Sequence, residues 1–213
     1  DQLGGKNMWT SVNDYKQFAN TFYSWTRDFS SVVYDGTHSD KRSDLITYQS
    51  YNEFSRGINS IPSSDANYTD NYKHIRRTNL LLQNAEAYAK PEDIKQYIGE
   101  AYFFRAYSYF DLLQLYGDVI ITKKPLDITD PEMKVKRNDR SEVVDLIIDD
   151  LNHAVENLPA FKELTTEEEG RISKEGAQAF LSRVALYEGT WQKSRNGNQN
   201  TQRSANLLDI AAK

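Results

Sequence analysis

The chain has 213 residues, a formal net charge of −5 and no cysteine. An acidic chain repels nucleic acid and anionic membrane surfaces, so neither is expected as a partner, and the lack of cysteine excludes disulfides, thiolate metal sites and a cysteine nucleophile. The length is enough to bury a substantial core, and aromatic residues make up 12% of the chain, which indicates thick helix packing or a stacking surface.

The first predicted helix follows a short polar lead, and Ser11 and Asp14 have the spacing of a capping box at its start. Its apolar stripe continues through Trp25 to Phe29, so Trp25 is interpreted as a packing residue. From about residue 30 to 69 the periodicity fails, while Gly, Ser, Asp and Asn become frequent among scattered aromatic residues. So long a connection is functional, mobile or built of short elements.

Two helix hairpins are predicted next, over about residues 70–117 and 139–192. In the first, Asp70 is expected to cap a helix that runs to about Ala89, and Pro91 suits the first position of the partner helix. This partner is apolar nearly all round, so it is expected to lie buried among neighbouring helices.

The second hairpin begins at a capping box formed by Asp139 and Glu142. Its return helix is predicted from about Ser173 to Trp191. The loop from 160 to 171 is acidic and expected to be exposed to solvent.

The hairpins have features of tetratricopeptide repeats. Gly99, Phe103 and Ala106 follow the small, large, small spacing of the second helix of such a repeat. A third unit begins near Ser204 and the sequence stops within it, so we expect residues 1–213 to be the N-terminal portion of a longer protein. The predicted fold class is all-α, with tetratricopeptide-like helix hairpins and a long irregular loop region.

The search for catalytic chemistry is negative. His38, His74 and His153 lie far apart without the paired spacing of a zinc site, and no GxSxG, GxxxxGK[ST] or GxGxxG motif occurs. No catalytic residue, metal ligand set or cofactor is therefore predicted. A calcium site remains an alternative in one acidic loop, which lacks the glycine and spacing of an EF-hand. Its residues are Asp127, Asp130 and Glu132.

Two polar residues on apolar helix faces need partners. Arg105 is expected to form a buried structural pair with Glu100, Asp111 or Asp150. Asn79 is expected to bond neighbouring backbone across the hairpin rather than to touch a ligand.

Four sequence blocks carry a resemblance to a known family. The segment IGEAYFFRAYSYFDLLQLYGDV, from Ile98 to Val119, resembles the second helix of the SusD/RagB family. Three further blocks follow in the family's order and bring the resemblance to about residues 68–193. They are NYKHIRRTNLLLQNAE, with Tyr72, Ile75 and Asn79; RSEVVDLIIDDLNHAVENLP; and GRISKEGAQAFLSRVALYEGTW.

The resemblance implies a function. SusD/RagB proteins are surface glycan-binding lipoproteins that work beside TonB-dependent transporters in Bacteroidetes outer membranes, and they carry tetratricopeptide-like helix pairs as their scaffold. The protein is accordingly expected to be non-catalytic and to capture oligosaccharides or polysaccharides at the cell surface for such a transporter. Its membrane attachment would be only through a lipid anchor upstream of residue 1.

The candidate glycan-binding residues come from the loop-rich region, which contains the aromatic and polar mixture that binds sugars. They are Tyr48, Tyr51, Asn67 and Tyr68. The family tends to have tryptophan at the position of Tyr68 and proline at that of Ile120, so the chain departs from the pattern at both. Two alternatives stay open: these tyrosines pack the loop onto the helices, or the segment is a tetratricopeptide-like protein-interaction scaffold with no sugar site.

Overall fold

A computed structural model describes residues 8–27, 53–195 and 201–213. In chain order its helices are α1 (Val12–Asn20), α2 (Glu53–Arg56), α3 (Ala66–Ala85), α4 (Lys95–Tyr116), α5 (Arg140–Asn157), α6 (Lys174–Arg195) and α7 (Thr201–Ala211). Short 3-10 helices lie between them at Thr21–Trp25, Pro91–Ile94, Pro131–Lys134, Phe161–Glu163 and Thr166–Glu168. The described residues contain no β-strand, only an isolated bridge between Val119 and Asn138, which confirms the all-α prediction.

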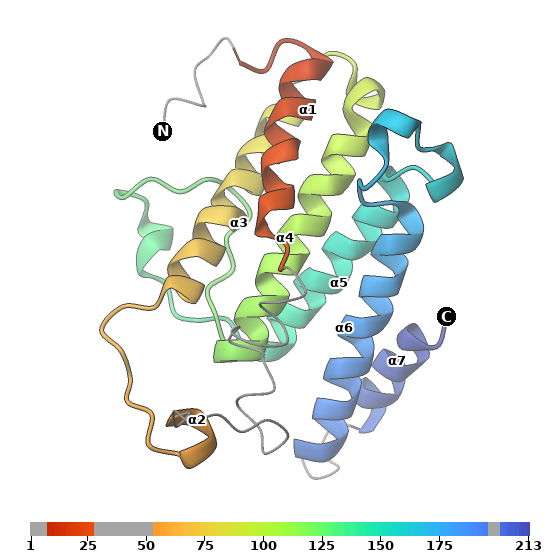
Figure 1. Ribbon diagram of the computed structural model, residues 1–213. Coiled ribbons are helices and arrows are strands. Elements are labelled where there is room, and N and C mark those ends of the chain that lie inside the picture. The colour runs from red at the N-terminus through yellow and green to blue at the C-terminus, as the bar shows by residue number, and fades with distance from the viewer. Residues whose placement is uncertain (1–7, 28–52, 196–200) are drawn as a thin grey trace, which may run out of the picture.

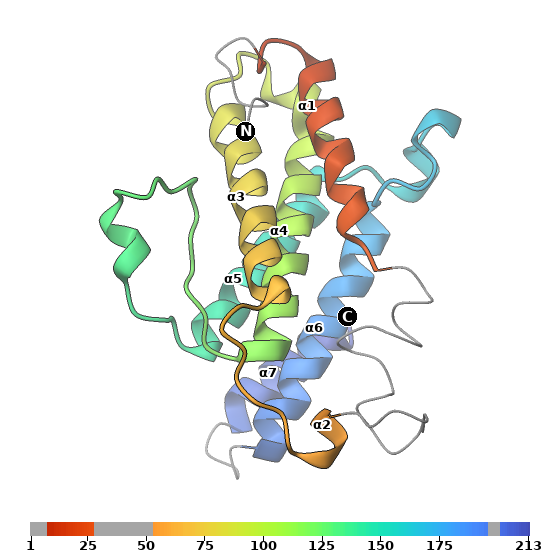
Figure 2. The same ribbon diagram turned by 60° about the vertical axis from the view of Figure 1, so that its left-hand side comes forward.

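The long helices form a row in which each packs against the next in sequence, from α3 to α7 (Figure 1). α3 and α4 run antiparallel, as do α5 and α6, and α1 lies against the first of these pairs. On the outer side of α3, the segment 120–138 stands away from the row and returns to the start of α5 (Figure 2).

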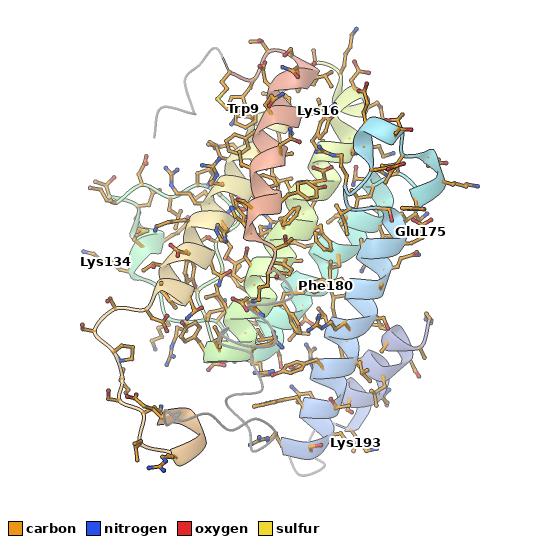
Figure 3. All side chains as sticks on the ribbon, in the orientation of Figure 1. Trp9, Lys16, Lys134, Glu175, Phe180 and Lys193 are labelled. Atoms are coloured by element: carbon orange, nitrogen blue, oxygen red, sulfur yellow. The ribbon has the colours of Figure 1, made fainter. Side chains whose placement is uncertain are left out.

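α4 is the centre of the core. Of its 22 residues 14 are buried, because α3 and α5 cover two of its sides while α1 and α6 approach the others. Phe180 of α6 fills the space between α4 and α6 (Figure 3). Its ring centroid lies 5.4 Å from that of Phe103 and 5.6 Å from that of Phe110, both on α4. Aromatic pairs at this separation add to the burial of apolar area.

Close helix contact explains the small residues of the repeat-like pattern. A Cβ atom added at Gly99 would lie 2.9 Å from Cγ of Leu158, at the end of α5, and Ala106 is completely buried. Larger side chains at either position would have to displace packed neighbours.

Three charged side chains of α4 are buried, Glu100, Arg105 and Asp111, and each has a partner of opposite charge, which for Asp111 is Arg27. Arg105 donates from Nε and Nη2 to both carboxylate oxygens of Asp150, at 2.8 and 2.6 Å. Glu100 accepts two bonds from Arg171, at 2.7 and 2.6 Å. The expectation that Arg105 forms a buried structural pair is confirmed, and among the three carboxylates considered the partner is Asp150.

The helix starts test the capping predictions. The capping boxes at Ser11 and at Asp139 are confirmed. The prediction that Asp70 caps the next helix is wrong, because Asp65 does so by accepting from the backbone N–H of Asn67. Both aspartates precede helical residues. The helix begins at the earlier one because this adds a turn whose Tyr68 packs against Tyr116 of α4. The packing interpretation of Trp25 is confirmed, since its ring lies against Phe22 and the core.

Candidate functional site

The structure divides the four candidate glycan-binding residues. Tyr48 and Tyr51 lie outside the described residues. Asn67 and Tyr68 were expected in a loop, but they occupy the first turn of α3. Asn67 supports this turn: its backbone N–H and its Nδ2 donate to Oδ1 of Asp65, at 2.9 and 3.0 Å, and its carbonyl accepts from Nδ2 of Asn71.

Tyr68 belongs to a cluster of three tyrosine rings where α3 begins and α4 ends. Its ring centroid lies 4.8 Å from that of Tyr72, one turn later on α3, and 5.3 Å from that of Tyr116 on α4. The Tyr116 hydroxyl donates to Oδ2 of Asp65 at 2.6 Å. The helix cap and the ring cluster therefore hold Tyr68 in place, with part of its surface left exposed.

A cavity of about 450 Å³ opens beside this cluster, between α3 and the segment 120–138. The α3 side presents two aromatic rings and two cations, and the opposite side presents apolar and polar residues together. The lining residues are Tyr68, Thr69, Tyr72, Lys73, Arg76, Ile120, Thr122, Lys124, Leu126, Glu132 and Met133.

Hydrogen bonds from one half-buried and one buried side chain of α3 fix the segment that forms the outer wall. The Tyr72 hydroxyl donates to the carbonyl of Ile120 at 2.8 Å. Asn79 donates from Nδ2 to the carbonyls of Thr122 and Lys124, at 2.9 and 3.3 Å. Asn79 thus bonds backbone, as predicted, but the backbone belongs to the segment after α4 and forms part of the cavity wall.

The same amide links the wall to the core. Oδ1 of Asn79 accepts from Nη1 of Arg105 at 2.7 Å, and Arg105 is held in turn by Asp150 on α5. Tyr109 contributes a second tie, since its hydroxyl accepts from the backbone N–H of Thr122 at 2.8 Å. The cavity wall is therefore positioned by a buried network that spans α3, α4 and α5, which is how side-chain networks specify one arrangement.

Burial keeps the tyrosine hydroxyls of this network protonated. It raises the pKa of Tyr72 and of Tyr109 above the ordinary phenol value. The Tyr72 hydroxyl therefore stays protonated, and remains a donor to Ile120, at pH values where an exposed tyrosine ionises.

Other hollows have a different chemistry. One of about 660 Å³ lies between α5 and α7, and its lining contains no aromatic ring. Among residues 8–27, 53–195 and 201–213, no group of three or more His, Asp or Glu side chains is placed to hold a metal ion. Within the same ranges no helix is long and apolar enough to cross a membrane.

Sequence reasoning missed half of this cavity. The sequence predicts Asn79 as a structural residue within the first hairpin, and it predicts no element between the two hairpins. A usable signal was the face of α3 that follows Tyr68, where Tyr72, Lys73 and Arg76 recur at helical spacing. No sequence pattern marks the opposite wall. Its position depends on hydrogen bonds to Tyr72, Asn79 and Tyr109, which lie far from most of it in the sequence or on another helix.

The family described as SusD-like, starch-binding and associating with the outer membrane matches residues 6–186. The chain belongs to the SusD-like family. This is a family of non-catalytic glycan-binding proteins.

Curated relatives and solved structures share this family. The SusD-like protein P38 of Formosa agariphila is 33% identical over 133 residues, which are 61% of this chain and 25% of that protein. A SusD-like protein of Bacteroides fragilis matches with a TM-score of 0.74 at 25% identity, over 100% of this chain and 40% of that one. A laminarin-binding SusD-like protein matches with a TM-score of 0.58 at 28% identity, over 74% of this chain and 32% of that one. The SusD-like chain described here thus spans well under half the length of these relatives.

Proposed function

We propose that the cavity between α3 and the segment 120–138 binds oligosaccharide. The observation that carries the proposal is the partly exposed ring of Tyr68, held by Tyr72 and Tyr116 at the edge of a cavity with a polar rim. Sugar rings offer an apolar C–H face to an aromatic ring and hydroxyl groups to polar side chains, so this combination suits them. Asn67 acts indirectly, by holding the helix start that carries Tyr68.

The protein as a whole, we infer, captures oligosaccharides or polysaccharides at the cell surface and passes them to a TonB-dependent outer-membrane transporter. A lipid anchor upstream of residue 1 attaches it to the outer membrane. The family description, starch-binding and associating with the outer membrane, supports the location, and the laminarin-binding relative supports a glycan as ligand. Tyr48 and Tyr51 are proposed to add further rings to the binding surface.

The test is a calorimetric titration of the intact protein with a panel of neutral and charged oligosaccharides. The affinity is expected in the micromolar to millimolar range, roughly, because a shallow site buries little of a hydrated ligand. Tyr68→Ala should weaken binding by about fivefold, which corresponds to about 1 kcal/mol for one aromatic contact. Phe161→Ala is the control, since Phe161 is 68% exposed and lies in the loop between α5 and α6.

A second function is favoured by one observation. Ile128, in the segment 120–138, is 92% exposed, and Met133 near it is 50% exposed. Exposed apolar residues on a tetratricopeptide-like scaffold suit contact with another protein. If the intact protein binds sugar with the same affinity after Tyr68→Ala, or binds none of the panel, this scaffold function without a sugar site in the described residues replaces the first proposal.

A further inference from the structure

The charged side chains that line the candidate cavity are mostly cationic. Three cationic side chains line it, Lys73, Arg76 and Lys124, against one carboxylate, Glu132. The two segments that form its walls, α3 and residues 120–138, carry eight Lys or Arg and four Asp or Glu, whereas the whole chain has a formal net charge of −5. The two segments therefore carry net positive charge in an otherwise acidic protein, and positive charge near the cavity attracts anionic ligands.

Each cation at the cavity has a carboxylate partner, but all three pairs are exposed. Lys73 pairs with Asp70 at 2.7 Å, and these side chains are 71% and 51% exposed. Lys124 pairs with Glu132 at 2.8 Å, and both side chains are about half exposed. Nη2 of Arg76 lies 3.9 Å from Oδ1 of Asp127, and 47% and 83% of these side chains are exposed. Exposed pairs contribute little to stability, so a ligand anion can exchange for the protein carboxylate at small cost.

Arg76 also has suitable geometry. Tyr68, Tyr72 and Arg76 follow each other at four-residue intervals on α3, so they lie along one face of the helix. A sugar ring against Tyr68 would carry its substituents along this face toward Arg76 and Lys73. The planar guanidinium offers paired N–H donors that match a carboxylate or a sulfate ester.

We propose that this cavity selects anionic oligosaccharides, whose charge comes from uronate carboxylates or sulfate esters, with Arg76 as the specificity-determining residue. The inference rests on the proposed glycan-binding function and specifies the ligand class of the same site.

The experiment compares matched pairs of probes on the intact protein. Tetragalacturonate is titrated against its methyl ester, and a sulfated galactan tetrasaccharide against its desulfated form. In at least one pair the charged member should bind about fivefold tighter or more, and raising sodium chloride from about 0.05 M to about 0.5 M should remove most of the difference. The two pairs distinguish carboxylate from sulfate recognition.

Two variants with opposite expected signs assign the effect to Arg76. Arg76→Gln should weaken binding of the charged probe by about fivefold and leave the neutral probe unchanged. Asp127→Asn should tighten binding of the charged probe, because it removes the competing carboxylate. Lys193→Gln is the control, since Lys193 is exposed at the far end of α6 (Figure 3).

The inference is wrong if charged probes bind no better than neutral ones in both pairs, whether both bind or neither does. It is also wrong if Arg76→Gln weakens charged and neutral probes equally. The proposed glycan-binding function still holds in these cases if neutral oligosaccharides of the panel bind and Tyr68→Ala weakens their binding. Failure of the anion selectivity can therefore be told apart from failure of the glycan-binding function.

Discussion

Arg105 and Arg76 each face an aspartate far away in sequence, but their surroundings differ. Arg105 and Asp150 expose 6% and 0% of their side chains and share two short hydrogen bonds. Arg76 and Asp127 expose 47% and 83% and lie 3.9 Å apart. Burial makes a charged pair costly to break, whereas exposure makes it cheap to exchange. The inner pair therefore maintains the fold, and the outer pair leaves a cation available at the cavity.

The largest expected effect breaks the inner pair. Arg105→Ala leaves the Asp150 carboxylate buried without its partner and removes the donor to Asn79, so the free energy of unfolding should fall by about 3 to 5 kcal/mol. Arg76→Ala should change it by less than about 0.5 kcal/mol. Denaturant unfolding followed by circular dichroism measures both. Equal losses in the two variants would contradict the comparison.

The packing around α4 gives the next largest effect. Ala106 is fully buried, so Ala106→Trp should overpack the helix contact and cost roughly 1 to 3 kcal/mol. Ala179→Trp, at an exposed position of α6, is the matched control and should unfold like the parent. If Ala106→Trp has the parent's unfolding midpoint, the close contact assigned to this side of α4 is incorrect.

The smallest effect concerns pH and the histidine at the edge of the core. The ring of His74 stacks on Trp25 with centroids 4.1 Å apart, and burial lowers the pKa of His74 to about 4. In the unfolded chain His74 takes up a proton near pH 6.5, whereas in the folded protein it stays neutral down to about pH 4. The contribution of the neutral His74 to the free energy of unfolding is therefore complete above about pH 6.5. It should decline as the pH falls toward 4.

Unfolding free energies at pH 7 and pH 5 test this expectation. His74→Phe retains an aromatic ring against Trp25 but cannot titrate, so its stability should fall less between the two pH values than that of the parent. Both proteins should respond alike between pH 7 and pH 8. Identical declines from pH 7 to pH 5 would show that His74 is not protonated on unfolding.

Local signals predicted the scaffold well, and non-local contacts explain what they missed. The capping box at Asp139 and the all-round apolar pattern of α4 were readable because they depend on residues within a few turns. The sequence could not show that Asp65 caps α3 in place of Asp70, because aspartate is a favourable N-cap at either position. The cavity needed the hydrogen bonds of Tyr72 and Asn79 to a segment more than forty residues later. Tyr48 and Tyr51 remain predictions.

The central claim is that sugar binds beside Tyr68 at the start of α3. The exposed ion pairs of Arg76 and Lys124 line the same cavity. A crystal structure of the intact protein with a bound oligosaccharide tests it most directly. The account predicts a sugar ring against the face of Tyr68, inside the cavity between α3 and the segment 120–138. An oligosaccharide bound wholly elsewhere, with no contact to Tyr68 or to this segment, would contradict it.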